Sequence, residues 1–144
     1  MTDTPSPFKF STSFKVRWVE TDLQGVVFFG HYLTYFDEAL MEYLEHLNFA
    51  YHQIKADGYD WVYAESRVQY KGALKLADRI AVHVRVSRIG NSSVTAEFQI
   101  FAHARFSILI ATGDVTFVVV DNVSRRPTRV PDSLRQSVAQ YQGD

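Results

Sequence analysis

The sequence contains no cysteine, only four prolines and seven glycines, and no long apolar run. Without cysteine, the chain cannot form a disulfide, use a thiol nucleophile or bind a metal through thiolates. The polar start, Met1-Thr2-Asp3-Thr4-Pro5-Ser6-Pro7, lacks the basic and apolar regions of a secretory signal, and no apolar run approaches membrane-spanning length. We therefore expect a cytoplasmic protein that does not bind membranes.

The sequence also has no large excess of positive or negative charge. Fifteen Lys and Arg against sixteen Asp and Glu give a formal charge of −1, which argues against a broad nucleic-acid-binding surface. Four histidines, His46, His52, His83 and His103, show no metal-ligand spacing, so we expect neither a metal nor another cofactor. The 144 residues, 47% of them hydrophobic, fit one domain with a substantial core.

Alternation of apolar and polar residues predicts a sheet. Structure should begin near Phe10, and the strands are expected at 14–18, 61–70, 80–87, 94–103 and 108–120. Gly90-Asn91-Ser92-Ser93 is typical of a hairpin turn between the third and fourth of these. Because residues 108–120 are apolar at nearly every position, we expect that strand in mid-sheet, covered on both faces.

Between residues 32 and 47 apolar residues recur every three or four positions, which predicts an amphipathic helix of about four turns. A short helical piece is expected at 49–55, and Pro131 can open a terminal helix. We expect a flexible N-terminus at 1–9, one domain at 10–135 and a C-terminal tail at 136–144. One helix covers only one face of an antiparallel α+β sheet, so a second subunit is expected to cover the other.

The stretch around Asp22 combines a carboxylate with a helix start. Asp22 lies three residues before Gly25, and a short apolar run then leads to Gly30 and the predicted helix. The first turn of a helix has backbone N–H groups without intrahelical partners, which can stabilise a developing oxyanion beside the carboxylate. The alternative is that Asp22 is a turn or cap residue with a purely local hydrogen bond.

The segment Val16-Arg17-Trp18-Val19-Glu20-Thr21-Asp22-Leu23-Gln24-Gly25-Val26-Val27-Phe28-Phe29-Gly30-His31-Tyr32-Leu33 resembles the signature of hotdog-fold acyl-CoA thioesterases of the 4-hydroxybenzoyl-CoA thioesterase and YbgC type. Weaker similarity at residues 70–78 and 119–131 extends the resemblance over residues 12–135. The chain departs from the family pattern at four positions, which are Phe29, His31, Leu40 and Gly72. The resemblance implies a hotdog fold, with an antiparallel five- to six-stranded sheet wrapped around one long central helix, in a homodimer or homotetramer.

The resemblance also implies hydrolysis of an acyl- or aryl-CoA thioester, with Asp22 as nucleophile or general base and with CoA as part of the substrate. His31 is a second catalytic candidate, because an imidazole titrates near neutral pH; the alternative is a first-turn histidine with a local hydrogen bond. The residues expected to bind the substrate are Gly25, Val26, Phe29, Gly30, Tyr32, Arg88, Ser92 and Ser93. The CoA phosphates favour arginine, so Arg125, Arg126 and Arg129 are further candidates, with surface solvation as the alternative.

Other interpretations remain open at this point. Asp37 and Glu38 on the helix are reserve carboxylates if Asp22 is only a turn residue. A hotdog module that binds acyl-CoA without hydrolysing it is a different class of function. A hotdog hydratase or dehydratase would need Asp22 and His31 arranged as a pair for proton transfer at carbon.

Overall fold

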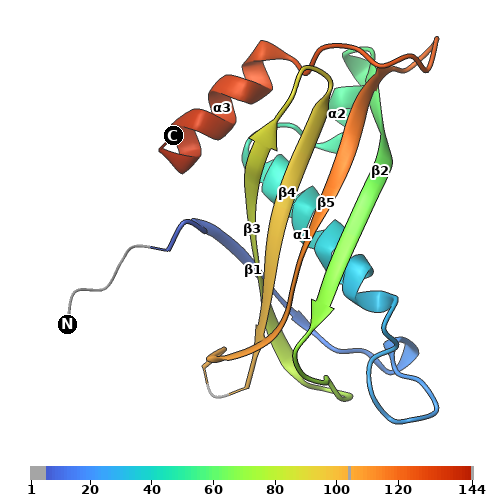
Figure 1. Cartoon of the computed structure of the whole chain (residues 1–144), viewed down its shortest axis with the longest axis vertical. Helices are drawn as coiled ribbons and strands as arrows, with labels where there is room; N and C mark the ends of the chain where they lie inside the picture. The colour runs from blue at the N-terminus through green and yellow to red at the C-terminus, as the bar shows by residue number, and fades with distance from the viewer. Residues whose placement is uncertain (1–5, 104, 144) are drawn as a thin grey trace.

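In the computed structural model, which describes residues 6–103 and 105–143, a long helix crosses one face of a five-stranded sheet (Figure 1). The elements follow one another as β1 (Phe10–Lys15), the 3₁₀ turn η1 (Trp18–Glu20), α1 (His31–His46), α2 (Tyr51–Ala56), β2 (Tyr59–Tyr70), β3 (Arg79–Ile89), β4 (Ser93–Ala102), β5 (Ile108–Asp121) and α3 (Asp132–Gln142). The α+β class and the order of strands and helices are therefore confirmed.

All neighbouring strands of the sheet run antiparallel, in the order β1-β3-β4-β5-β2. The predicted hairpin joins β3 to β4, and the N–H of Gly90 donates to the C=O of Ser93 at 2.8 Å. β5 lies between β4 and β2, so its predicted place inside the sheet is confirmed. Within the chain, β1 and β2 are the two edges of the sheet.

α1 lies against the sheet because one stripe of its residues is apolar and buried. The buried members of this stripe are Tyr32, Tyr35, Phe36, Ala39, Leu40, Tyr43 and Leu44. The ring of Phe36 stacks on Phe98 of β4 with centroids 4.4 Å apart. Gly113 of β5 makes this approach possible, because a Cβ there would lie 2.5 Å from Cε2 of Phe36. The predicted central helix is thus confirmed to within one residue at each end.

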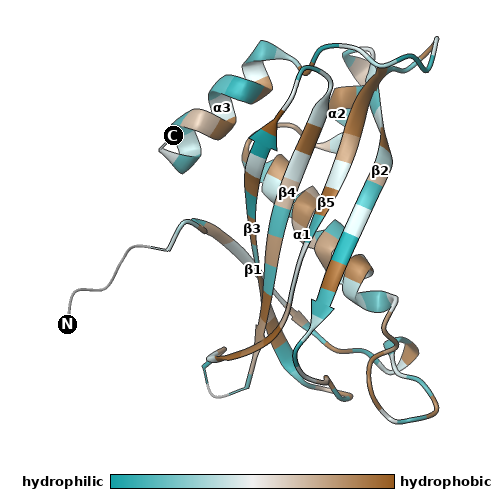
Figure 2. Cartoon of the chain, in the orientation of Figure 1, coloured by the Kyte–Doolittle hydropathy of each residue, from teal (hydrophilic) through white to brown (hydrophobic). Residues whose placement is uncertain are grey.

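The middle of the opposite face of the sheet is polar, so the expectation that β5 is covered on both faces along its length is wrong for the single chain. Along one row, Arg85 of β3 lies 2.6 Å from Glu97 of β4, and Arg67 of β2 lies 3.5 Å from Asp114 of β5. Figure 2 shows hydrophilic and hydrophobic residues alternating along these strands. The polar residues within β5, such as Thr112, turn to this face. An apolar face is therefore no longer a reason to expect a second subunit.

The first strand ends earlier than predicted. After β1 the buried Val16 is followed by η1, where Trp18 is 79% exposed, so the alternation expected through Trp18 is wrong. The turn forms because the carboxylate of Glu20 accepts the backbone N–H of Arg17 at 2.8 Å. Asp22 is therefore reached through this turn and not directly from a strand.

The C-terminal helix α3 completes the sheet beside β1. β1 pairs with β3 only as far as Val84, and the side-chain amide of Gln142 then binds both backbone groups of Val86, at 2.8 and 2.9 Å. The hydroxyl of Tyr43 donates to the same amide oxygen at 2.6 Å. Gln142 thus takes the place of a further strand residue.

The limits of the domain differ from the expected ones at the C-terminal end. α3 runs across the boundary that we expected at residues 135 and 136, and its residues Val138 and Gln142 are buried. Of the N-terminal segment expected to be flexible, residues 1–5 lie outside the described residues. In the part of the chain that the structure describes, no helix has both the length and the apolar character needed to cross a membrane.

Candidate active site

Asp22 lies in a tight hairpin that leads into α1. Thr21 and Val27 form an antiparallel bridge across it, and the N–H of Asp22 donates to the C=O of Val26 at 2.9 Å. The N–H of Gly25 closes the turn on the C=O of Asp22 at 3.0 Å. Gly25 has φ +80°, in the left-handed region that favours glycine. The hairpin therefore holds the backbone of Asp22 in one defined place.

The carboxylate of Asp22 is only partly engaged. Oδ1 accepts the N–H of Gln24 at 2.8 Å, whereas Oδ2 makes no hydrogen bond to any other described residue. The local turn hydrogen bond considered from the sequence is thus present, but it occupies one oxygen. Asp22 is not the helix cap, because the N-cap of α1 is Gly30. The second oxygen is open to a ligand or a water.

Two backbone N–H groups beside α1 are also unpaired. The N-cap Gly30 has no side chain to bind the helix end. The N–H of His31 donates to Phe28 at 2.9 Å, but among the described residues no acceptor faces the N–H of Phe29 or Gly30. The partial positive charge of the helix N-terminus adds to these donors. The open donors therefore lie just before α1, two and three residues earlier than the start of the helix that we expected at residue 32.

His31 makes the local contact that was the alternative to catalysis. Its Nδ1 lies 3.3 Å from the hydroxyl of Thr34, and its ring packs against Phe28 with centroids 6.0 Å apart. Within the described ranges no hydrogen bond joins His31 to Asp22. Over the same ranges, no cluster of three or more His, Asp or Glu side chains could hold a metal ion.

The aromatic candidates divide into an exposed and a buried one. Phe29 is 64% exposed and packs on Phe28 with centroids 4.7 Å apart. The hydroxyl of Tyr70 donates to the C=O of Phe29 at 3.0 Å, which fixes the backbone beside the open donors. Tyr32 is 3% exposed and its burial raises the pKa of its hydroxyl. Phe29 is therefore accessible to a substrate, whereas Tyr32 supports the site from the core.

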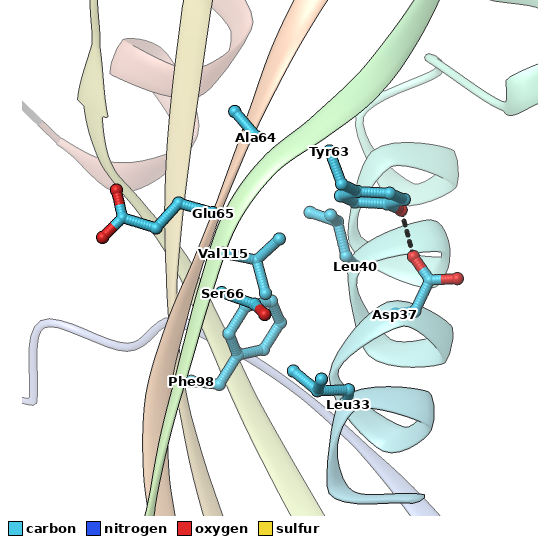
Figure 3. A pocket seen from close by; sticks show the side chains of 9 residues that line it. All are labelled: Leu33, Asp37, Leu40, Tyr63, Ala64, Glu65, Ser66, Phe98 and Val115. Carbon is cyan, nitrogen blue, oxygen red and sulfur yellow. Dashed lines mark hydrogen bonds between the residues drawn. The ribbon is translucent and has the colours of Figure 1, made fainter. Parts of the chain in front are cut away.

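A cavity of about 410 Å³ lies between α1 and β2 (Figure 3). Its walls are mainly apolar and come from α1, β2, β4 and β5; the apolar side chains that line it are Leu33, Leu40, Ala64, Phe98 and Val115. This volume falls within the range of small-molecule binding sites. Leu33 is the third residue of α1, three positions after Gly30, so the cavity extends along the helix from the end that carries the open donors.

The two reserve carboxylates lie on different sides of α1. Asp37 lines the cavity and accepts a hydrogen bond from the hydroxyl of Tyr63, as Figure 3 shows. Burial, together with this bond, raises the pKa of Tyr63 to about 12. Glu38 lines a separate hollow beside Arg17 and Glu20. Asp37 is therefore the one of the two that can contact a molecule in the cavity.

A residue that the sequence did not single out, Glu20, is buried two positions before Asp22. Its side chain is 4% exposed, and it accepts hydrogen bonds from Arg17 and from the hydroxyl of Tyr35. Burial alone would raise the pKa of Glu20, but the backbone N–H and guanidinium of Arg17 and the Tyr35 hydroxyl hold it below its usual value. The sequence gives no sign of this burial, because the partner Tyr35 lies 15 residues away.

The residues expected to bind the CoA phosphates are not brought to Asp22 within one chain. The Asp22 hairpin is tied to residues 74 and 75, just before β3, through Val26 and Val27. Arg88, Ser92 and Ser93 lie at the other end of β3, roughly 30 Å away at the usual rise per strand residue.

The late arginines are partly engaged elsewhere. Arg125 binds the buried carboxylate of Asp60 at 2.7 Å, and Arg129 lies 3.1 Å from Asp132. Arg126 makes no side-chain hydrogen bond or ion pair with any other described residue, so of these three it has the guanidinium most open to a phosphate.

Residues 16–138 match the model of the thioesterase-like superfamily, so the chain belongs to this family. The acyl-CoA thioesterase YbgC of Haemophilus influenzae is 27% identical over 127 residues, which are 88% of this chain and 91% of the relative. The PA5185 protein of Pseudomonas aeruginosa is 28% identical, with a TM-score of 0.83 over 94% of this chain and 93% of the other. A DHNA-CoA thioesterase from Staphylococcus aureus is 22% identical, with a TM-score of 0.84 over 92% of this chain and 90% of the other. The hotdog fold implied by the resemblance is confirmed.

Proposed function

We propose that this chain hydrolyses an acyl- or aryl-CoA thioester to the free acid and coenzyme A. The observation that carries the proposal is that one segment, the Asp22 hairpin leading into α1, carries both an open carboxylate oxygen on Asp22 and the open N–H groups of Phe29 and Gly30. Thioester hydrolysis needs these two elements, a nucleophile or base and donors for the carbonyl oxygen. The name of the H. influenzae relative, an acyl-CoA thioesterase, supports the same reaction.

Two routes use the same residues. In one, Asp22 attacks the carbonyl carbon, the C–S bond breaks, and CoA leaves as a thiolate. The mixed anhydride that remains between Asp22 and the acyl group is then hydrolysed by water. In the other, Asp22 removes a proton from a water that attacks the carbonyl, and the CoA thiolate takes up a proton as it leaves. In both, the N–H groups of Phe29 and Gly30 stabilise the negative charge on the carbonyl oxygen.

The cavity between α1 and β2 is the proposed place of the acyl group. Leu33, Leu40 and Phe98 form apolar parts of its wall, which suit an aliphatic chain or an aromatic ring. The Asp37–Tyr63 pair supplies one polar contact within the cavity. A thioester bound at the start of α1 would extend its acyl group along the helix into this space.

We also propose that the working form is a homo-oligomer. Large apolar side chains are exposed around the Asp22 hairpin, including Trp18 at 79%, Val19 at 72% and Leu23 at 108%. β2 is an edge strand with a free side, and its edge borders the cavity. Exposed apolar clusters and free strand edges are typical of association surfaces. Light scattering should show no stable monomer; a folded, active monomer at micromolar concentration would contradict this part.

A thiol-release assay over short-chain, long-chain and aromatic CoA thioesters tests the reaction. We expect release of CoA from at least one class at a rate that depends on the enzyme concentration. Saturable binding of acyl-CoA without thiol release would instead indicate a binding module and would overturn the proposal. The cytoplasmic location stays a prediction from the sequence.

A further inference from the structure

Glu20 carries a buried carboxylate that the proposed reaction does not use. Oε1 accepts the backbone N–H of Arg17 and the hydroxyl of Tyr35, both at 2.8 Å. Oε2 accepts Nε and Nη2 of the Arg17 guanidinium at 2.9 and 2.7 Å. A carboxylate that is 4% exposed is stable only when partners of this kind replace water, so these contacts fix its position.

The backbone of Glu20 joins the two halves of the Asp22 hairpin. Its C=O accepts the N–H of Phe28 at 2.9 Å, and the pairing continues through Thr21 and Val27. Phe28 directly precedes the two open donors, the N–H groups of Phe29 and Gly30. Glu20 therefore connects the segment that carries the carboxylate with the segment that carries the donors.

Tyr35 connects this hairpin to α1. It lies in the second turn of the helix and is 3% exposed, so its ring cannot shift without repacking the core. Its hydroxyl bond to Glu20 spans 15 residues of sequence. The side chain of Arg17, in contrast, is 70% exposed, and among the described residues it forms its hydrogen bond and ion pair with Glu20 alone. It therefore neutralises Glu20 without a hydrogen bond to the helix.

We propose that Glu20 is a positioning residue for thioester hydrolysis: through Tyr35 it holds the Asp22 carboxylate in a fixed place relative to the N–H donors of Phe29 and Gly30. This inference rests on the proposed function of Asp22. A displacement of about 1 Å at a catalytic group can lower a rate by about 100-fold, so a looser hairpin lowers kcat. KM changes less, because the acyl cavity is formed by other residues.

Two variants weaken the contact between Glu20 and Tyr35 while nearly keeping the size of both side chains. Glu20→Gln keeps the size and one acceptor oxygen but loses the charge, and Tyr35→Phe removes only the hydroxyl. Asp60→Asn is a chemically matched control. Asp60 is also a buried carboxylate, with a side chain 9% exposed, and it accepts from an arginine, a tyrosine hydroxyl and a backbone N–H, but at the start of β2.

We expect kcat to fall about tenfold in Glu20→Gln and in Tyr35→Phe, with KM within about twofold of the parent. The double variant should be no slower than the slower single variant, because both break one link. Asp60→Asn should lose a comparable amount of thermal stability and keep its kcat. Each assay is run below the unfolding transition, and light scattering checks that the association state is unchanged.

Parental kcat in both Glu20→Gln and Tyr35→Phe would overturn the inference, as would an equal loss of kcat in Asp60→Asn. If Glu20→Gln does not fold, Tyr35→Phe decides the question alone. A parent protein without any thiol release, or an Asp22→Asn variant with normal turnover, would defeat the proposed function itself. That outcome is therefore distinct from a failure of the positioning role.

Discussion

The two ends of the sheet differ in whether their polar groups are hydrogen-bonded. At the end that carries Asp22, an oxygen of this carboxylate and the N–H groups of Phe29 and Gly30 have no partners among the described residues. At the other end, the guanidinium of Arg135 donates to three backbone C=O groups, at 2.6, 3.0 and 3.2 Å. Gln142 likewise binds both backbone groups of Val86.

This difference indicates that polar groups at one end of the sheet serve function and those at the other end serve stability. Unpaired polar groups beside exposed apolar side chains, such as Leu23 and Phe29, contribute little to the fold. They are instead available to a substrate. The paired groups at the α3 end satisfy buried donors and acceptors, which stabilises the fold. Substitutions of the unpaired groups at the Asp22 end and of the paired groups at the α3 end should therefore affect different measurements.

Asp22→Asn should have the largest effect on activity. The amide keeps the size of the side chain and its turn hydrogen bond to Gln24, but it has neither the charge of a nucleophile nor the proton affinity of a base. We expect kcat to fall by about 100-fold or more, with KM roughly kept and a stability loss of about 1 kcal/mol at most. Steady-state kinetics and thermal unfolding on one preparation measure both.

A stable Asp22→Asn variant with near-normal turnover would show that Asp22 is only a turn residue. Asp37 would then be the next carboxylate to test, because it lines the cavity. Glu38 is a suitable comparison, since it lies on the other side of α1.

Gln142→Ala should show the reverse pattern, a loss of stability without a loss of kcat. The variant leaves the N–H and C=O of Val86 and the hydroxyl of Tyr43 without the partner that Gln142 provides. An unsatisfied buried backbone group costs about 1–3 kcal/mol, so the loss at the two groups of Val86 should lower the free energy of unfolding in urea by roughly 2–6 kcal/mol. A lower kcat per folded molecule in this variant would break the proposed separation between the two ends.

Much of the fold could be predicted because its core follows regular periods. The helix at 32–47 and the strand at 94–103 differ from α1 and β4 by a residue at each end. The early end of β1 could not be predicted, because the turn at Trp18 depends on the contact of Glu20 with Arg17. Alternation describes which side chains share a face, but not where a side chain bends the backbone.

The candidate site was predicted where the chemistry is local in sequence. Asp22, Gly25 and Gly30 lie within one short motif, and the hairpin brings them to the start of α1. The Asp37–Tyr63 and Glu20–Tyr35 contacts join residues 26 and 15 positions apart. A single sequence contains no period or spacing that reveals such pairs, so the cavity and the positioning link could not be predicted.

Leu33→Phe should alter the choice of acyl group at the Asp22 end. Leu33 lines the cavity near the start of α1, so a larger ring there narrows the space for the acyl group. We expect kcat/KM for long-chain or aromatic thioesters to fall about tenfold relative to acetyl-CoA. An equal loss for all substrates would place the acyl group elsewhere. Leu76→Phe, at an exposed position that does not line the cavity, is the control.

Acid should destabilise both ends, through Glu20 at one and Asp60 at the other. Hydrogen bonds and arginine partners offset burial and hold the pKa of each carboxyl below its usual value, which is 4.5 for glutamate and 3.8 for aspartate. Their contribution to stability is therefore fully present above those values and is lost as pH falls through the lower folded-state pKa. Urea unfolding from pH 7 to pH 3 measures the loss. Glu20→Gln and Asp60→Asn should each reduce it, and an unchanged pH profile would contradict the assignment.

The smallest effect is expected at the exposed arginines. Arg88 lies at the far end of β3 from Asp22, and Arg126 has no side-chain partner among the described residues, so both can meet the CoA phosphates only at the protein surface. Surface ion pairs contribute less than about 1 kcal/mol and are screened by salt, so replacing both by alanine should raise KM two- to fourfold and leave kcat unchanged. The increase should disappear at high salt, where the parent has already lost these contacts. A change in kcat would instead mean that the association of subunits brings these arginines to the reacting thioester. The contrast between the two ends of the sheet would then hold only within a single chain.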